Sequence, residues 1–317
     1  AIGSHQGFVY VRHEYPLAVD HMDKAINDAA RYGFIGENIL GSGFNFTVKI
    51  VRGGGAFVCG ESTALMASLE GKAGEPRAKH IHTVESGAWG KPSNLNNVET
   101  WANVPLIINM GAEEYAMLGP EGNKGTKLFS MSGSLNTAGI VEAPLGISLR
   151  ELIFDICGGL PKGRTFKGAL VGGPDGAVLP ADKLDLKVDF DTLWEAGATM
   201  GAGGLIVLDD KTCVVDLSLH FMKFTTYESC GKCVPCREGA KQMYGSLQRI
   251  SSGKGEEGDI DLLLELSDLM KAGSLCALGR DAPNPVQSCL KYYRDEFEAH
   301  IKGRCPTGVC RIRKKWA

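Results

Sequence analysis

The sequence lacks several features that mark specialised classes of protein. Its 317 residues carry a formal net charge of -3, so it has no excess of basic side chains for binding nucleic acid. No apolar run approaches the roughly 18 residues that a transmembrane helix needs. The first residues have neither the charged start nor the apolar middle of a signal peptide. We therefore expect a cytoplasmic protein with no nucleic-acid partner and no transmembrane segment.

Cysteine is present, but not in the arrangement of a small disulfide-stapled domain. The ten cysteines are few for this length and unevenly placed, and a cytoplasmic location would keep them reduced. Cys59, Cys157 and Cys213 lie in apolar segments, where we expect them to act as small buried hydrophobic side chains. Internal repeats and low-complexity segments are also absent.

The first part of the chain has the pattern of a strand–helix–strand unit. Residues 7–15 alternate like a strand, residues 16–34 have the apolar spacing of an amphipathic helix, and residues 44–54 alternate again. This order favours a parallel sheet. A further helix is predicted to end at Gly71, and another over 96–111 closes the region.

The rest of the chain changes character twice. Short strands and glycine-rich turns follow, with a helix expected over 148–156, as in a small α+β module. From about residue 212 to residue 302 the pattern is mostly helical, and one helix is predicted to stop at Gly273. The predicted fold class is thus α/β for the first part of the chain, α+β for the middle part and all-α for the last part.

The glycine-rich run "GGGAFVCGESTAL" at residues 53–65 is compatible with two roles. Backbone amides freed by glycine and the positive end of a following helix attract phosphate. The run nevertheless matches neither the dinucleotide fingerprint nor the nucleotide-triphosphate P-loop. A purely structural turn therefore remains the alternative.

A group of four cysteines gives a stronger signal. Cys230, Cys233 and Cys236 are separated by two residues each, and Cys276 supplies a distant fourth thiol. Four thiolates suit either a [4Fe-4S] cluster or tetrahedral zinc. Zinc sites of four cysteines usually consist of two separated pairs, so this spacing favours the cluster.

Four motifs together resemble one known family. They are "GGGAFVCGESTALMASLEGKAGEPRAK", "GKPSNLNNVETWANVP", "SCGKCVPCREG" and "SLCALGRDAPNPVQSCLKYYRDEFEAHI". The chain is similar to the flavin-bearing NADH-oxidising subunit of respiratory complex I and its relatives in NAD(P)-linked hydrogenases, formate dehydrogenases and electron-bifurcating complexes. The resemblance implies a Rossmann-like FMN- and NAD(P)-binding domain at 1–117, a ubiquitin-like (SLBB) module at 118–211, a helical bundle with a [4Fe-4S] cluster at 212–303, and the start of a ferredoxin-like extension at 304–317.

The resemblance also implies site residues. The cluster ligands would be Cys230, Cys233, Cys236 and Cys276; the FMN contacts would be Gly60, Glu61, Asn96, Asn97 and Thr100; and the NAD(P) contacts would be Phe57, Ser62, Lys79 and His82. No catalytic side chain is expected, because the cofactors perform the chemistry. For "LNNVET" the structural alternative is a helix N-cap.

The sequence also departs from the family pattern. The family's glycine-rich loop with a lysine, and its Asn-x-Asp-Glu segment, would both precede residue 1. Phe57, Ser62 and His82 stand where many relatives have Tyr, Glu and Phe. Loss of a carboxylate near the adenosine ribose would remove repulsion of a 2′-phosphate, so we hypothesise that NADPH is accepted; neutral drift at the rim of the pocket is the alternative.

The resemblance implies a diaphorase subunit that exchanges hydride between NAD(P)H and FMN and passes single electrons through the cluster. The expected partners are a small [2Fe-2S] thioredoxin-like subunit and a larger iron–sulfur, hydrogenase or formate dehydrogenase subunit. The alternatives are a complex I type NADH:quinone oxidoreductase subunit and a flavin-free structural subunit. Arg237, next to the third cluster cysteine, would either raise the cluster potential or form a surface ion pair.

Overall fold

The computed structural model describes residues 2–312. The chain divides into two compact units between Leu95 and Asn96, and each is described by itself.

The first unit is built on the predicted strand–helix–strand pattern. Strands β1 (Gln6–Arg12) and β2 (Thr47–Gly53) pair in parallel, with helix α1 (Pro16–Arg31) between them in the chain. Proline at the first helical position fits the start of α1. The prediction of a parallel pair is therefore confirmed. Helix α2 (Ser62–Leu69) follows the glycine-rich segment after β2.

The second unit contains the other named elements. Its strands are β3 (Thr126–Gly133), β4 (Gly139–Pro144), β5 (Phe166–Val171), β6 (Ala177–Pro180) and β7 (Gly204–Asp209). Its helices are α3 (Val98–Met110), α4 (Ala112–Tyr115), α5 (Phe190–Glu195), α6 (Val214–Glu228), α7 (Val234–Ser251), α8 (Asp259–Gly273), α9 (Ala277–Asp281) and α10 (Asn284–Ile301). Short helical turns of this unit occur at Glu151–Ile156, Gly173–Asp175 and Ala181–Lys183, and those of the first unit occur at Ile39–Gly41, Phe57–Gly60 and Ala88–Gly90.

The strands of the second unit form a mixed sheet in the order β4-β3-β7-β5-β6. β3 and β7 pair in parallel, and the other neighbours are antiparallel. Alternate residues of β3 are buried, among them Phe129 and Met131, as expected for a strand with one face on a core. The turn at Glu151–Ile156 is π-helical and begins with a capping box, in which Ser148 and Glu151 exchange backbone-to-side-chain hydrogen bonds.

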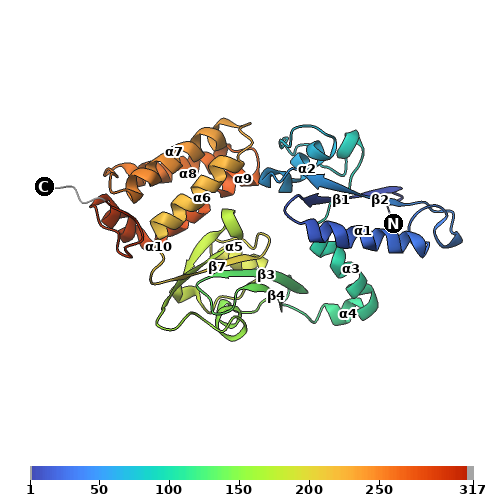
Figure 1. Ribbon diagram of the computed structural model, residues 1–317, viewed down its shortest axis with the longest axis horizontal. Helices are drawn as coiled ribbons and strands as arrows, with labels where there is room; N and C mark the ends of the chain where they lie inside the picture. The colour runs from blue at the N-terminus through green and yellow to red at the C-terminus, as the bar shows by residue number, and fades with distance from the viewer. Residues whose placement is uncertain (1, 313–317) are drawn as a thin grey trace. The chain divides into compact units, whose positions relative to one another are not determined.

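Helices α6, α7, α8 and α10 pack side by side (Figure 1). Their buried side chains form one apolar core, to which Leu170, Val178 and Leu208 of the sheet also contribute. At the sheet edge, the backbone N–H of Val178 in β6 donates to Oγ of Ser288 in α10 at 2.9 Å. Covering an edge strand in this way leaves fewer unpaired backbone groups. None of the helices in residues 2–312 is long and apolar enough to cross a membrane.

Candidate functional site

The four cysteines assigned to the cluster lie at helix ends of the second unit. Cys230 lies in the turn between α6 and α7, and Cys233 is the N-cap of α7. Cys236 lies in the first turn of α7, and Cys276 is the N-cap of α9. Cys236 and Cys276 are buried, whereas Cys230 and Cys233 are half-buried. The structure therefore brings the remote Cys276 to the three closely spaced cysteines.

The thiols act on one another electrostatically. Burial raises the pKa of the Cys236 thiol to about 11, against a hydrogen bond with Ser229 that lowers it. The neighbouring Cys233, Cys276 and Cys230 add further upward contributions to this pKa. Four thiolates would repel one another in this setting, so their common ionisation requires a cation between them.

Hydrogen-bond donors already point at the two buried sulfurs. The Ser229 hydroxyl lies 3.3 Å from Sγ of Cys236. The backbone N–H groups of Gly279 and Leu278 hydrogen-bond to Cys276. Gly279 is needed here for space, since a Cβ on it would lie 2.8 Å from Cβ of Cys236. Such donors stabilise thiolates and tune the potential of a bound cluster.

The spacing of the four thiols also bears on the choice between zinc and a cluster. One group of three or more Cys, His, Asp or Glu side chains in residues 2–312 has all its ligand atoms within 4.8 Å of one another, and that group does not include Cys230, Cys233, Cys236 or Cys276. A single ion needs its ligands that close, whereas a four-iron cube holds its thiolates farther apart. The geometry therefore favours the cube.

Arg237 contributes an ion pair and a turn contact. Its Nε lies 2.9 Å from Oε1 of Glu238, and another guanidinium nitrogen donates to the carbonyl of Gly231 in the cysteine turn. The ion-pair alternative is thus observed, and the guanidinium also braces the loop that carries Cys230 and Cys233.

In the first unit, Glu61 organises the start of α2. Its Oε2 accepts from the backbone N–H groups of Thr63 and Ala64 at 2.9 and 3.0 Å. Its Oε1 accepts from the Ser62 hydroxyl at 3.2 Å and lies 3.0 Å from Nζ of Lys79. Three residues predicted from sequence to bind cofactor or nucleotide, Glu61, Ser62 and Lys79, are therefore in contact.

These contacts control the charge of Glu61. Burial raises the pKa of its carboxyl group, but the Thr63 hydroxyl, Lys79 and the Ala64 N–H outweigh burial and hold the pKa below its ordinary value. Glu61 is consequently a stable carboxylate. Because it already occupies the free amides at the start of α2, those amides do not form the phosphate cradle considered for residues 53–65.

The other predicted nucleotide residues of this unit lie near its surface. The backbone N–H of His82, an exposed residue, donates to Oε2 of Glu85 at 2.8 Å. Phe57 is half-buried, and the Arg12 guanidinium lies 6.0 Å from its ring centroid. Gly60 faces open space, since a Cβ placed on it would meet no atom within 4 Å.

Asn96, Asn97 and Thr100 belong to the second unit and are exposed. Asn97 is the N-cap of α3, where its Oδ1 accepts from the backbone N–H of Glu99 at 2.9 Å. The helix N-cap, which was the structural alternative for this motif, is therefore observed. It leaves the side-chain NH₂ of Asn97 available to donate to a ligand.

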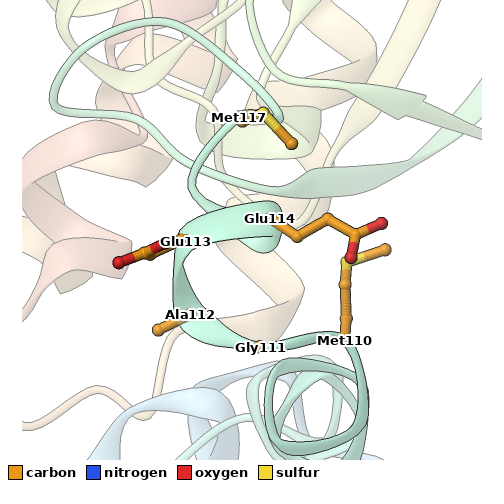
Figure 2. A pocket seen from close by; sticks show the side chains of 6 residues that line it. All are labelled: Met110, Gly111, Ala112, Glu113, Glu114 and Met117. Carbon is orange, nitrogen blue, oxygen red and sulfur yellow. The ribbon is translucent and has the colours of Figure 1, made fainter.

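A surface hollow of about 550 Å³ lies at the turn from α3 to α4. Figure 2 shows the residues that line it: Met110, Gly111, Ala112, Glu113, Glu114 and Met117. The side chains of Glu113 and Glu114 point in opposite directions. None of the residues predicted from sequence lines this hollow, and its side chains do not form a recognisable catalytic group.

The structure reveals a second sulfur-rich group that sequence analysis missed. Ligand atoms of Cys213, His300, Cys305 and Cys310 all lie within 4.8 Å of one another. Cys213 is buried in the apolar core of the helical region, as predicted, and its sulfur also contacts His300 and Cys310. The regular interval of five residues from His300 to Cys305 and from Cys305 to Cys310 could have indicated from the sequence that these side chains form a group.

These features define an α/β protein with four neighbouring thiols in a helical region, and comparison with known proteins agrees with that class. Residues 1–106 match the Nuo51 FMN-binding domain, and residues 216–300 match the NADH-ubiquinone oxidoreductase-F iron-sulfur binding region. Cys213, Cys305 and Cys310 fall outside both matched ranges.

Individual proteins are also similar to this chain. The NADP-reducing hydrogenase subunit HndC of Solidesulfovibrio fructosivorans is 48% identical over 98% of this chain and 64% of its own length. An NADH-quinone oxidoreductase subunit of Rhizobium meliloti (strain 1021) is 44% identical over 96% of this chain and 73% of its own length. A crystal structure of NAD+-reducing [NiFe]-hydrogenase in the H2-reduced state matches with a TM-score of 0.85 and 32% identity, over 95% of this chain and 50% of that one.

The chain belongs to the family of NADH-quinone oxidoreductase and hydrogenase subunits defined by these two regions, which confirms the resemblance seen in the sequence. It spans about two thirds of the length of these curated relatives and half the length of the hydrogenase chain. It carries the family's FMN-binding domain and iron–sulfur region, and its mixed α/β fold with a helical C-terminal region is like that of the hydrogenase.

Proposed function

We propose that the chain is the diaphorase part of a multi-subunit oxidoreductase. It would exchange hydride between NAD(P)H and FMN and pass single electrons to partner subunits, in a hydrogenase, formate dehydrogenase or electron-bifurcating complex. The observation that carries this proposal is the meeting of Cys230, Cys233, Cys236 and Cys276 beside the donors Ser229 and Gly279. A complex I type subunit and a flavin-free structural subunit are the alternatives.

The residues present fit the proposed cofactors. The four thiols would hold a [4Fe-4S] cluster, with their spacing too wide for one ion. Gly60 borders open space that a ligand can occupy, while Asn96, Asn97 and Thr100 offer uncharged hydrogen-bonding groups to FMN. Glu61 would accept hydrogen bonds as a carboxylate rather than transfer a proton. When bound, FMN supplies two-electron chemistry and the cluster supplies one-electron chemistry.

We assign the domains as predicted from the sequence. A Rossmann-like FMN and NAD(P) domain over 1–117 is supported by the parallel β1 and β2 pair. A ubiquitin-like SLBB module over 118–211 is supported by the mixed sheet, in which its first and last strands, β3 and β7, pair in parallel. The bundle over 212–303 holds the cluster. The prediction for 304–317 falls partly on residues 313–317, which lie outside the described residues.

A diaphorase needs partners, because a flavin and one cluster give electrons no final destination. We propose a small [2Fe-2S] thioredoxin-like subunit and a larger iron–sulfur, hydrogenase or formate dehydrogenase subunit. The names of the similar proteins, which are subunits of larger enzymes, support such assembly. A cytoplasmic location remains part of the proposal.

The test is the anaerobic visible spectrum of the purified complex that contains this chain, recorded while NADH and then NADPH are added. The proposal predicts bleaching of flavin and cluster absorbance. A spectrum without a flavin band and without a response to either nucleotide would leave the structural-subunit alternative.

Ser62 is proposed to set the choice of nucleotide, together with Lys79 and His82. Its hydroxyl already lies beside the Glu61 carboxylate and its Lys79 partner. The variant Ser62→Glu would place a second carboxylate there and repel a 2′-phosphate, so the ratio of kcat/KM for NADPH to that for NADH should fall by roughly tenfold or more. Ser62→Ala is the matched control and should leave this ratio unchanged. An unchanged ratio in both variants would support neutral drift.

A further inference from the structure

A buried ion pair joins α3 to the sheet of the second unit. Nζ of Lys127 in β3 pairs with Oε2 of Glu99 in α3. The same ammonium donates to the carbonyl oxygens of Leu128 and Ala202 at 3.1 and 3.3 Å. Oε1 of Glu99 accepts from the backbone N–H of Leu128 at 2.8 Å. Lys127 is 8% exposed, so its ammonium has exchanged water for these three protein oxygens and depends on them.

This contact matters more for α3 than a similar contact would for an apolar helix. None of the residues of α3, Val98–Met110, is buried, so apolar packing does little to fix the helix. Other polar contacts of α3 are made within its own neighbourhood: Nδ2 of Asn103 donates to the carbonyl of Glu99 at 2.8 Å, and the Tyr115 hydroxyl donates to Oδ1 of Asn103 at 2.9 Å. The Glu99 carboxylate, in contrast, reaches the sheet.

Glu99 lies among the residues that are predicted to contact FMN. Asn97 precedes it by two positions and Thr100 follows it directly. Oδ1 of Asn97 accepts from the backbone N–H of Glu99 at 2.9 Å, so the backbone of Glu99 orients the Asn97 side chain. The position of Glu99 relative to the sheet therefore sets the position of these FMN contacts.

The sheet is attached to the helical bundle at its other side. β3 pairs with β7, and β7 pairs with β5. Lys167 of β5 forms a second buried ion pair, with Glu296 of α10, and its Nζ also donates to the carbonyl oxygen of Thr212 at 2.7 Å. Three apolar side chains of the sheet belong to the core of the bundle: Leu170, Val178 and Leu208.

The sheet therefore connects two parts of the second unit that matter for electron transfer. One is the start of α3 with its predicted FMN contacts, and the other is the bundle, which carries the four cluster cysteines. The rate of electron transfer falls steeply as donor and acceptor move apart, so both groups need to be held in place closely. A buried ion pair adds little net stability compared with apolar side chains of the same volume, which leaves geometry as the main contribution of the Glu99–Lys127 pair.

We propose that the Glu99–Lys127 pair fixes the FMN-contacting start of α3 to the sheet, and through the sheet to the cluster-bearing bundle, so that electrons pass from flavin to cluster over one set distance. In that step one electron leaves reduced FMN and enters the oxidised cluster, and no bond to the chain forms or breaks. Glu99 and Lys127 are thus positioning residues. This inference rests on the proposed function, because it requires both cofactors.

The test uses the purified complex that contains this chain and the double variant Glu99→Gln/Lys127→Met, which removes both charges and leaves neither one buried alone. Flash photoreduction of the flavin, followed in the absorbance of the cluster, should show electron arrival slowed by roughly tenfold. The midpoint potential of the cluster, measured by EPR titration, should not change. Hydrogen exchange of the α3 backbone amides should become faster, while that of β7 stays the same.

A second variant, Glu99→Asp, keeps both charges and shortens the link by one methylene group. It should slow the electron step to an intermediate extent, and it serves as the test if the double variant does not fold. Arg150→Met/Asp185→Asn is the matched control, since this exposed pair of the same unit, with Nε 2.6 Å from Oδ1, joins neither α3 nor the bundle to the sheet. The control should leave the electron step and the exchange of α3 unchanged.

The inference is overturned if the electron step keeps its wild-type rate in both Glu99 variants, or if the control slows it equally. A shift of the cluster potential large enough to account for the slower step would overturn it as well, because the effect would then be electrostatic rather than geometric. A wild-type complex without flavin would sink the proposed function, and this inference with it. Unchanged electron transfer in variants that retain flavin and iron would sink this inference alone.

Discussion

At the scale of single residues, cysteines of this chain occupy different chemical settings. Cys236 and Cys276 are buried beside other thiols and hydrogen-bond donors. Cys213 is equally buried but faces His300. Cys157 is buried in the apolar core of the sheet region. Burial alone therefore does not identify a metal-binding cysteine; the polar groups around the sulfur do.

Replacement of Cys276 tests the cluster assignment most directly. Cys276→Ala removes the ligand that is remote in sequence, so we expect iron content and the broad visible absorbance of the complex to fall to a small fraction of the wild-type values. Cys157→Ala removes an equally buried thiol without neighbouring thiols and should leave both unchanged. Full iron content in Cys276→Ala would exclude Cys276 as a ligand.

Asp175 gives the fold a pH dependence. Its Oδ1 is covered and has no hydrogen-bond partner among the described residues. Burial raises the pKa of Asp175 from 3.8 to about 7, and the charge of the nearby Asp281 adds to this shift. As pH rises, the unfolded state therefore loses this proton first. The resulting loss of stability begins near pH 4 and is complete above about pH 7.

The variant Asp175→Asn should remove this loss. Between pH 5.5 and pH 8.5 the wild-type free energy of unfolding should fall by about 2 kcal/mol more than that of the variant, or roughly 4–8 °C in thermal midpoint. Thermal unfolding at the two pH values measures the difference. Asp182→Asn, at an exposed carboxylate in the following turn, should behave as the wild type. If the stability of the wild type and that of Asp175→Asn changed equally with pH, the raised pKa of Asp175 would be contradicted.

At the scale of elements, α3 is attached to the sheet mainly through Glu99. Most side chains of α3 are exposed, so the helix has little apolar burial to stabilise it. Oε1 of Glu99 accepts from the backbone N–H of Leu128 at 2.8 Å, and Oε2 pairs with Nζ of Lys127, a buried residue of β3. The sequence of α3 alone does not predict this attachment, because the partners of Glu99 lie in another element, the strand β3.

Glu99→Gln should loosen α3. The amide can still accept from Leu128, but the Lys127 ammonium is left without its counter-charge, at an expected cost of about 2 kcal/mol. Urea unfolding measures this cost, and hydrogen exchange of the Leu128 N–H reports the local opening. Glu113→Gln, at an exposed position in α4, is the control. An equal effect of both variants would show that the ion pair does not hold the helix.

At the scale of the whole molecule, the apolar cores lie in the second unit. Both extended core clusters are made of residues from Phe129 onward. The cluster cysteines and the Cys213 group lie in the same unit. The first unit has fewer buried side chains, among them Val58, Ala64 and Met66.

The unit from Asn96 onward is therefore expected to fold by itself. A fragment of residues 96–312, expressed with iron supplied, should be soluble, resist limited proteolysis and contain iron. It should not retain flavin, because Gly60 and Glu61 are missing. The full chain prepared in parallel is the control. A fragment that is unfolded or free of iron would show that residues 1–95 are required for the second unit.

The sequence by itself determined what depends on neighbouring residues. Apolar periodicity predicted the β1–α1–β2 unit and the helical region, and the spacing of Cys230, Cys233 and Cys236 indicated a shared centre. These features arise from interactions within a few residues of chain. Only the tertiary structure decided which distant groups meet: Cys213 with His300, Glu99 with Lys127, and Lys167 of β5 with Glu296 of α10. Such pairs depend on how helices and strands pack, which local patterns do not specify.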